Sequence, residues 1–159
     1  APFGIGFHPY VTVGTDRIDD AHLTVPAGEH LATDERGLPL GKHAVIGSEF
    51  DFLAPRPLGA TRLDTAFTTL VRDPDERAVA VLERPDRQRA VRVWIDGAFR
   101  YLMVYTGDTL EPPARRRAAI AIEPMTCPPN ALRTGTDLIE LEPGQTWSGR
   151  WGISVEEDI

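Results

Sequence analysis

Short apolar runs separated by turn residues recur along the whole chain, and none keeps a helical period over several turns. Runs of this length, bounded by Gly, Pro and Asp, are typical of β-strands. The pattern predicts strands or extended segments at residues 10–13, 22–27, 30–45, 77–83, 88–96, 101–107, 118–124 and 138–155. We therefore expect an all-β fold built from antiparallel strands.

Some segments carry more detail than others. Residues 77–83 and 88–96 alternate in polarity and flank the turn sequence RPDR, which predicts a hairpin. Residues 101–107 and 118–124 are almost continuously apolar and are candidates for central strands. Residues 63–70 fit either a short helical turn or an irregular strand. Because neither an internal repeat nor a linker is visible, residues 1–159 are expected to form one unit.

The charge balance changes the range of partners to consider. The chain has 159 residues with 17 basic and 24 acidic side chains, so its formal net charge is −7. This excess of acidic groups argues against a nucleic-acid surface and against binding to an anionic membrane. The one basic cluster, Arg115 to Arg117, is expected to be a solvated entry to a strand.

The lone cysteine bears on the cellular compartment, and the first residues bear on whether the sequence is part of a longer protein. Cys127 has no partner for an intramolecular disulfide and fits a reducing compartment, so a cytoplasmic location is expected. No apolar run approaches the length of a membrane span. Since the chain begins Ala1-Pro2-Phe3 without a methionine, we expect a processed product or a piece of a longer protein.

Three residues are candidates for acid–base chemistry or substrate binding. Glu123 ends an apolar run and precedes a proline-rich loop, where a partly desolvated carboxylate could act as a general base. His8, between Phe7 and Pro9, could exchange a proton near neutral pH. Asp64 could bind a polar substrate. The alternatives are an exposed edge Glu, a satisfied core or turn His, and an Asp that caps a turn.

The remaining reactive residue types give weaker signals. His22, His30 and His43 are scattered, show no metal-ligand spacing and are expected at the surface. Cys127 follows Glu123 by four positions but has no neighbouring histidine, so it is interpreted as a small, partly buried residue. No phosphate-binding glycine loop and no nucleophile elbow is present.

Several segments together resemble the aldose 1-epimerase (galactose mutarotase) family, in the order in which that family carries them. The sequence from Glu123, followed by the closing strand, is the most specific of them. The segments are GFHPY, LTVPAGEHLATDERGLPLG, LDTAF, YLMVYTGD, IAIEPMTCPPNAL and LEPGQTWSGRWGISV.

The resemblance implies a galactose mutarotase-like β-sandwich and an isomerase that interconverts the anomers of a hexose. By resemblance, Glu123 is the general base and His8 the general acid, while Asp64 binds sugar hydroxyls. The implied partner is a monosaccharide, and neither a metal nor another cofactor is implied.

The resemblance covers only the C-terminal half of the family's length. We therefore expect this chain to be part of a longer mutarotase-like domain and to associate with the missing half or with a second copy. Two alternatives stay open at this point: a carbohydrate-binding β-sandwich without turnover, and an inactive fragment.

Overall fold

The computed structural model describes residues 1–157, which form antiparallel strands joined by loops and a few short helical turns. The elements in chain order are β1 (Pro2–Phe3), β2 (Tyr10–Val11), the 3₁₀ turn η1 (Ile18–Asp20), β3 (His22–Thr24), β4 (Ala27–Thr33), β5 (Pro39–Ala44), β6 (Arg56–Pro57), β7 (Asp64–Leu70), β8 (Ala78–Glu83), β9 (Arg89–Ile95), β10 (Tyr101–Tyr105), the 3₁₀ turn η2 (Pro113–Arg115), β11 (Ile120–Met125), α1 (Ala131–Thr134), β12 (Ile139–Glu140) and β13 (Trp151–Glu157).

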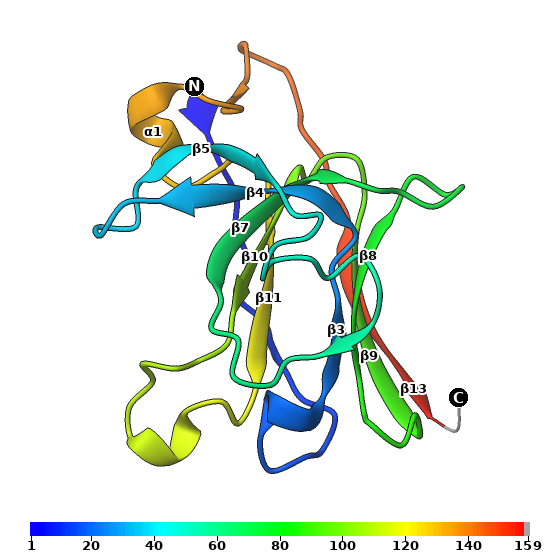
Figure 1. Ribbon diagram of the computed structural model, residues 1–159. Helices are drawn as coiled ribbons and strands as arrows, with labels where there is room; N and C mark the ends of the chain where they lie inside the picture. The colour runs from blue at the N-terminus through cyan, green and yellow to red at the C-terminus, as the bar shows by residue number, and fades with distance from the viewer. Residues whose placement is uncertain (158–159) are drawn as a thin grey trace.

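Two larger sheets face each other as the layers of a sandwich (Figure 1). The first has six strands in the order β2-β11-β10-β7-β4-β5, and the second has five in the order β13-β9-β8-β3-β6. The short strands β1 and β12 pair separately, beside α1. The predicted all-β antiparallel sandwich is confirmed, and so is the β8–β9 hairpin.

The core lies between the two sheets and explains which strand positions are apolar. Phe67, Leu102 and Ile122 point into it from the six-stranded sheet, and Leu23 and Leu82 from the five-stranded one. All five side chains are buried almost completely. Burying such a side chain contributes roughly 1.5–3 kcal/mol, so this cluster stabilises the packing of one sheet on the other.

The segment that sequence left ambiguous, residues 63–70, is the regular strand β7. It runs inside the six-stranded sheet between β10 and β4. Four consecutive residues, Thr65 to Thr68, are buried because both faces of the sheet are covered at this point. Strict alternation is therefore lost, which is why the pattern did not separate a strand from a helical turn.

His30 corrects a second expectation, since it is buried rather than at the surface. It lies opposite Phe67 on β7, and the ring of Phe50 stacks on it with centroids 4.0 Å apart. Burial lowers the pKa of His30, because the charged imidazolium is disfavoured there. The covering residue comes from a loop distant in sequence, which the local pattern could not reveal.

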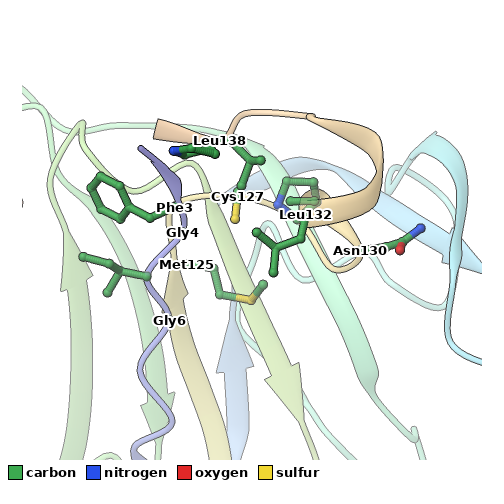
Figure 2. Close-up of a pocket in the computed structure, with 12 residues that line it drawn as sticks. Phe3, Gly4, Gly6, Met125, Cys127, Asn130, Leu132 and Leu138 are labelled. Carbon is green, nitrogen blue, oxygen red and sulfur yellow. The ribbon is translucent and has the colours of Figure 1, made fainter. Parts of the chain in front are cut away.

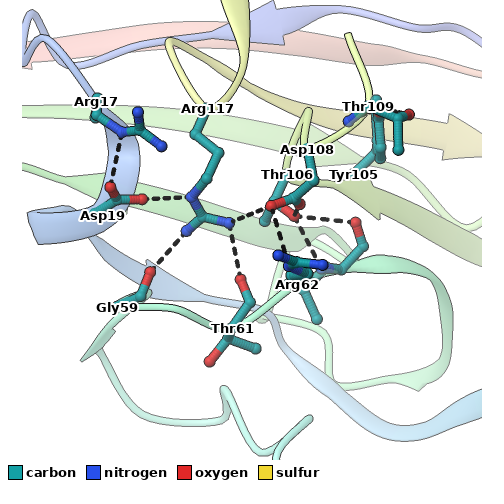
Figure 3. Close-up of polar contacts among 11 residues, drawn as sticks. Arg17, Asp19, Gly59, Thr61, Arg62, Tyr105, Thr106, Asp108, Thr109 and Arg117 are labelled. Atoms are coloured by element: carbon teal, nitrogen blue, oxygen red, sulfur yellow. Dashed lines mark hydrogen bonds and ion pairs between the residues drawn. The ribbon is translucent and has the colours of Figure 1, made fainter. Parts of the chain in front are cut away.

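The basic run at 115–117 corrects a third expectation. Arg117 is buried, and its guanidinium pairs with Asp19 and with Asp108, the latter at 3.1 Å (Figure 3). It also donates to the carbonyl oxygens of Gly59 and Thr61, at 2.7 Å and 3.0 Å. Arg117 therefore joins three loops at one end of the sandwich instead of facing solvent.

Candidate functional site

The candidate site lies on the outer face of the six-stranded sheet. It lies there because the side chains of β11 point alternately into the core and to the outer face. Ile120 and Ile122 point into the core, so Ala121, Glu123 and Met125 point to the opposite face. Glu123 thus leaves the apolar interior although it lies within a strand of buried residues.

The segment before β2 places His8 opposite Glu123. Gly6 pairs with Met125, and Tyr10 pairs with Ala121. Between these two pairs, the amide of Phe7 donates to the carbonyl of Pro124 at 3.0 Å. His8 and Glu123 are therefore neighbours across the β2–β11 edge, with their side chains on the same face.

The two side chains are in direct contact. Nε2 of His8 lies 3.2 Å from Oε1 of Glu123, and their side chains are 53% and 13% exposed. Burial raises the pKa of the Glu123 carboxyl, His8 opposes this shift, and the charge of Asp64 adds to it. A carboxyl that is mostly buried and paired with a half-exposed imidazole is suited to proton exchange with a bound molecule.

Asp64 joins the same face from the other side. It is the first residue of β7 and pairs with Tyr105, which in turn pairs with Ala121. Its side chain is exposed, and among residues 1–157 no hydrogen bond or ion pair engages its carboxylate. The sequence alternative of an Asp that caps a turn is therefore wrong, and the carboxylate is available to a ligand.

Two hollows open on this face, one beside Asp64 and Met103 and the other beside Met125. One, of about 330 Å³, includes Asp64, Ala66 and Met103 and reaches the turn between β4 and β5. The other, of about 490 Å³, lies between the N-terminal segment and α1 and includes Gly6 and Met125 (Figure 2). Carboxylates of Asp34, Glu35 and Asp64 line the first hollow, and no lysine or arginine lines either one.

Sequence reasoning missed three residues that surround the pair. Met103 lies between Glu123 on β11 and Ala66 on β7, and forms the floor of the site. Tyr105 and Tyr10 lie in the next row, on either side of Ala121. The signal was present: residues two positions apart on a strand share a face, so Tyr10 follows His8 and Met103 precedes Tyr105 on this surface.

The loop that follows Glu123 is fixed by side chains of the neighbouring strand. After its prolines, the chain makes the single helical turn α1, entered at Asn130 and left at Gly135, both with positive φ. Asp137 then accepts hydrogen bonds from Tyr101 and Arg100, each at 2.6 Å. The burial of Tyr101 and its bond to Asp137 raise the pKa of its phenol, so it remains a donor.

The cysteine and the other three histidines do not join His8, Glu123 and Asp64 on this face. Cys127 is half-buried beside the N-terminal segment, and His22, His30 and His43 lie on β3, β4 and β5, away from β11. Within residues 1–157, no three His, Cys, Asp or Glu side chains are grouped so that they could hold a metal ion. Nor does that part of the chain contain a helix long and apolar enough to cross a membrane.

Comparison with known sequences points to one family. The sequence model of the aldose 1-epimerase family matches residues 1–154. The uncharacterized protein YihR of Escherichia coli strain K12 is 33% identical over 145 residues, which make up 91% of this chain and 44% of that protein. The chain thus spans less than half the length of the curated relative it matches.

Solved structures share the fold at lower identity. A putative aldose 1-epimerase from E. coli K12 superimposes with a TM-score of 0.76 at 22% identity, over 99% of this chain and 51% of that one. A GalM/aldose epimerase homologue from C. elegans gives 0.81 at 15% identity, over 98% and 52%. Galactose 1-epimerase from Lactobacillus acidophilus gives 0.70 at 21%, over 98% and 50%.

Proposed function

Since the chain belongs to the aldose 1-epimerase family, we propose that it carries the acid–base pair of a mutarotase. The reaction is interconversion of the α and β anomers of a free hexose such as glucose or galactose. The observation that carries the proposal is the 3.2 Å contact between Nε2 of His8 and Oε1 of Glu123, with the unpaired carboxylate of Asp64 on the same face.

The two groups act in opposite senses on one substrate. Glu123, ionised, takes the proton of the anomeric hydroxyl, while His8, protonated, gives a proton to the ring oxygen. The bond between the anomeric carbon and the ring oxygen breaks and leaves the open-chain aldehyde. After rotation about the C1–C2 bond, the ring closes on the other face of the carbonyl group. His8 then takes back its proton from the ring oxygen, and Glu123 returns its proton to the anomeric oxygen.

Asp64 binds the substrate rather than reacting with it. An ionised carboxylate accepts hydrogen bonds from hydroxyl groups, and such charge-assisted bonds are about twice as strong as neutral ones. The hollow beside Asp64 is large enough to admit sugar hydroxyls. Met103, which is only partly buried, offers apolar surface beside Asp64, which suits the C–H face of a pyranose.

Charge favours an unphosphorylated sugar. Three carboxylates and no basic side chain line the hollow that includes Asp64. Arg116 and Arg117 are engaged with Glu111, Asp19 and Asp108. Arg36 is bonded to Asp34, so an anionic group on the sugar would meet the negative charges of Glu35 and Asp64 in this hollow.

Association with a further part of a longer protein, or with a second copy, belongs to the same proposal. Ile153 and Val155 on the edge strand β13 pair with Val93 and Val91, whose side chains belong to the core. They nevertheless stay 45% and 58% exposed. An edge strand with apolar side chains invites pairing, and sedimentation of the chain as a monomer at high concentration would contradict association with a second copy.

Polarimetry tests the reaction directly. Fresh α-D-glucose and α-D-galactose are followed with the chain, with Glu123→Gln and with buffer alone. We expect a rate above buffer that falls about 10²–10⁴-fold in the variant, while sugar binding, followed by calorimetry, persists. Binding without any rate would instead indicate a carbohydrate-binding module, and the absence of both would indicate an inactive fragment. A cytoplasmic location remains a prediction from the lone cysteine.

A further inference from the structure

Tyr10 contacts the side chain of His8, the proposed general acid. It follows His8 by two positions on the β2 edge, and their side chains share the outer face of the sheet. The two rings lie 5.0 Å apart between centroids and are tilted by 30° to each other, at a separation typical of interacting aromatic rings. No other aromatic contact to His8 is present among residues 1–157.

His8 needs such a contact because its other restraint is slight. Its imidazole is half-exposed, and the one ion pair that it makes within residues 1–157 is with Glu123 at 3.2 Å. Rotation about the terminal side-chain bond of histidine has broad minima, so one contact leaves the ring free to turn. A proton donor that must reach a ring oxygen while Glu123 serves the neighbouring hydroxyl loses efficiency with small displacements.

We propose that Tyr10 is a positioning residue, whose aromatic ring holds the His8 imidazole with Nε2 directed at Glu123 and at the substrate. The inference rests on the proposed mutarotase function for its meaning, but the positioning itself is a property of the folded chain. The ring does this work, and the phenolic hydroxyl is dispensable for it.

The surroundings of the phenol agree with a neutral, packing role. Partial burial raises the pKa of the Tyr10 phenol, and Tyr105, Glu123 and Asp64 raise it further by their negative charge. The hydroxyl therefore stays protonated across the neutral range. Ala121, the residue between Tyr10 and Tyr105, is buried and small, so it leaves room for both rings on this row.

The test compares four forms of the chain: wild type, Tyr10→Phe, Tyr10→Ala and Tyr10→Leu. Phe keeps the ring without the hydroxyl, whereas Leu keeps bulk on a strand without aromaticity. Phe7→Ala is the matched control, because the neighbouring ring of Phe7 contacts Phe99 and Trp151 rather than His8. Amide NMR spectra establish that each variant is folded before it is used.

The first readout is the nitrogen-detected NMR signature of the His8 imidazole, which needs no enzymatic activity. We expect Tyr10→Phe and Phe7→Ala to keep the His8 ring shifts of the wild type. Tyr10→Leu, and Tyr10→Ala where it folds, should lose the ring-current shift and move towards values of a freely rotating histidine. Unchanged His8 shifts in Tyr10→Leu would overturn the proposal.

The second readout is kcat against KM for mutarotation. The Ala and Leu variants should lose about 10- to 100-fold in kcat with little change in KM, and Phe should restore most of it. A Phe variant as impaired as Ala would assign the role to the hydroxyl and overturn the proposal. Where the wild-type chain shows no turnover, the proposed function fails but the NMR comparison still decides the positioning of His8.

Discussion

His8 and Glu123 are far apart in the sequence and meet across the β2–β11 edge, with Nε2 and Oε1 separated by 3.2 Å. This contact affects the pKa of the Glu123 carboxyl. Glu123 is mostly buried and has a raised pKa, and His8 is the neighbour that opposes that rise. The contact with His8 is therefore one of the causes that set the pKa of the Glu123 carboxyl, alongside burial and the charge of Asp64.

The first prediction concerns the acid limb of the rate profile. The proposed mechanism uses the ionised form of Glu123, so kcat/KM should fall as pH decreases through the carboxyl's pKa. Because burial raises that pKa above the ordinary 4.5, the fall should begin at a higher pH than an exposed glutamate would give. Polarimetric rates in buffers of constant ionic strength measure this limb, and a midpoint below 4.5 would contradict the prediction.

A second prediction concerns stability and requires no activity. A carboxyl whose pKa is raised by folding favours the native state below its unfolded pKa, and that contribution is lost as pH rises through the folded pKa. Glu123→Gln removes this loss. The variant should therefore gain free energy of unfolding relative to the wild type between about pH 4 and neutrality, measured by urea titration at several pH values.

The comparison is informative in the opposite case as well. Removing the charge also removes the contact with His8, which stabilises the ionised form. A Glu123→Gln variant that is less stable than the wild type at pH 7 would show that this contact outweighs the cost of burial. The internal control is low pH, where the protonated Glu123 of the wild type and the Gln of the variant are both neutral, so the two proteins should be equally stable.

The third prediction separates binding from chemistry at Asp64. Asparagine keeps the shape of the side chain but loses the charge that strengthens hydrogen bonds to sugar hydroxyls. Asp64→Asn should raise KM by about 10-fold or more, as expected for a charge-assisted bond of about 1.5–3 kcal/mol. It should also shift the acid limb to lower pH, since the charge of Asp64 contributes to the raised pKa of Glu123.

Asp16→Asn is the matched control for this experiment. Asp16 is exposed and lies in the loop between β2 and η1, away from the row of Asp64, Tyr105 and Ala121. It makes the same change of net charge and should alter neither KM nor the pH profile. An equal effect of both variants would attribute the change to net charge instead of to a contact with the sugar.

The sequence predicts the strands better than it predicts which residues meet. Residues 101–107 and 118–124 are central strands, as their apolar runs indicated, because burial on a sheet leaves a local pattern. The contact of His8 with Glu123 depends on pairing between distant segments, and only the family resemblance brought them together. Tyr10 could have been found from its period-two spacing, whereas the covering of His30 by Phe50 leaves no local signal.

The last prediction concerns Arg117, whose buried guanidinium joins three loops. Its side chain is 8% exposed, and it pairs with Asp19 and Asp108 and bonds to two carbonyl oxygens. Arg117→Met would leave these acceptors unpaired in a partly buried place. Breaking such a network from one side costs about 3–5 kcal/mol, so the urea midpoint should fall strongly.

Arg17 supplies the comparison, because it pairs with the same Asp19 at 2.9 Å but its side chain is 57% exposed. Exposed ion pairs contribute about 0–1 kcal/mol, since water solvates both partners when they separate. Arg17→Met should therefore leave the midpoint almost unchanged. Equal losses in the two variants would contradict the assignment of Arg117 as the stabilising member, and would indicate that the charge of Asp19 alone governs this end of the sandwich.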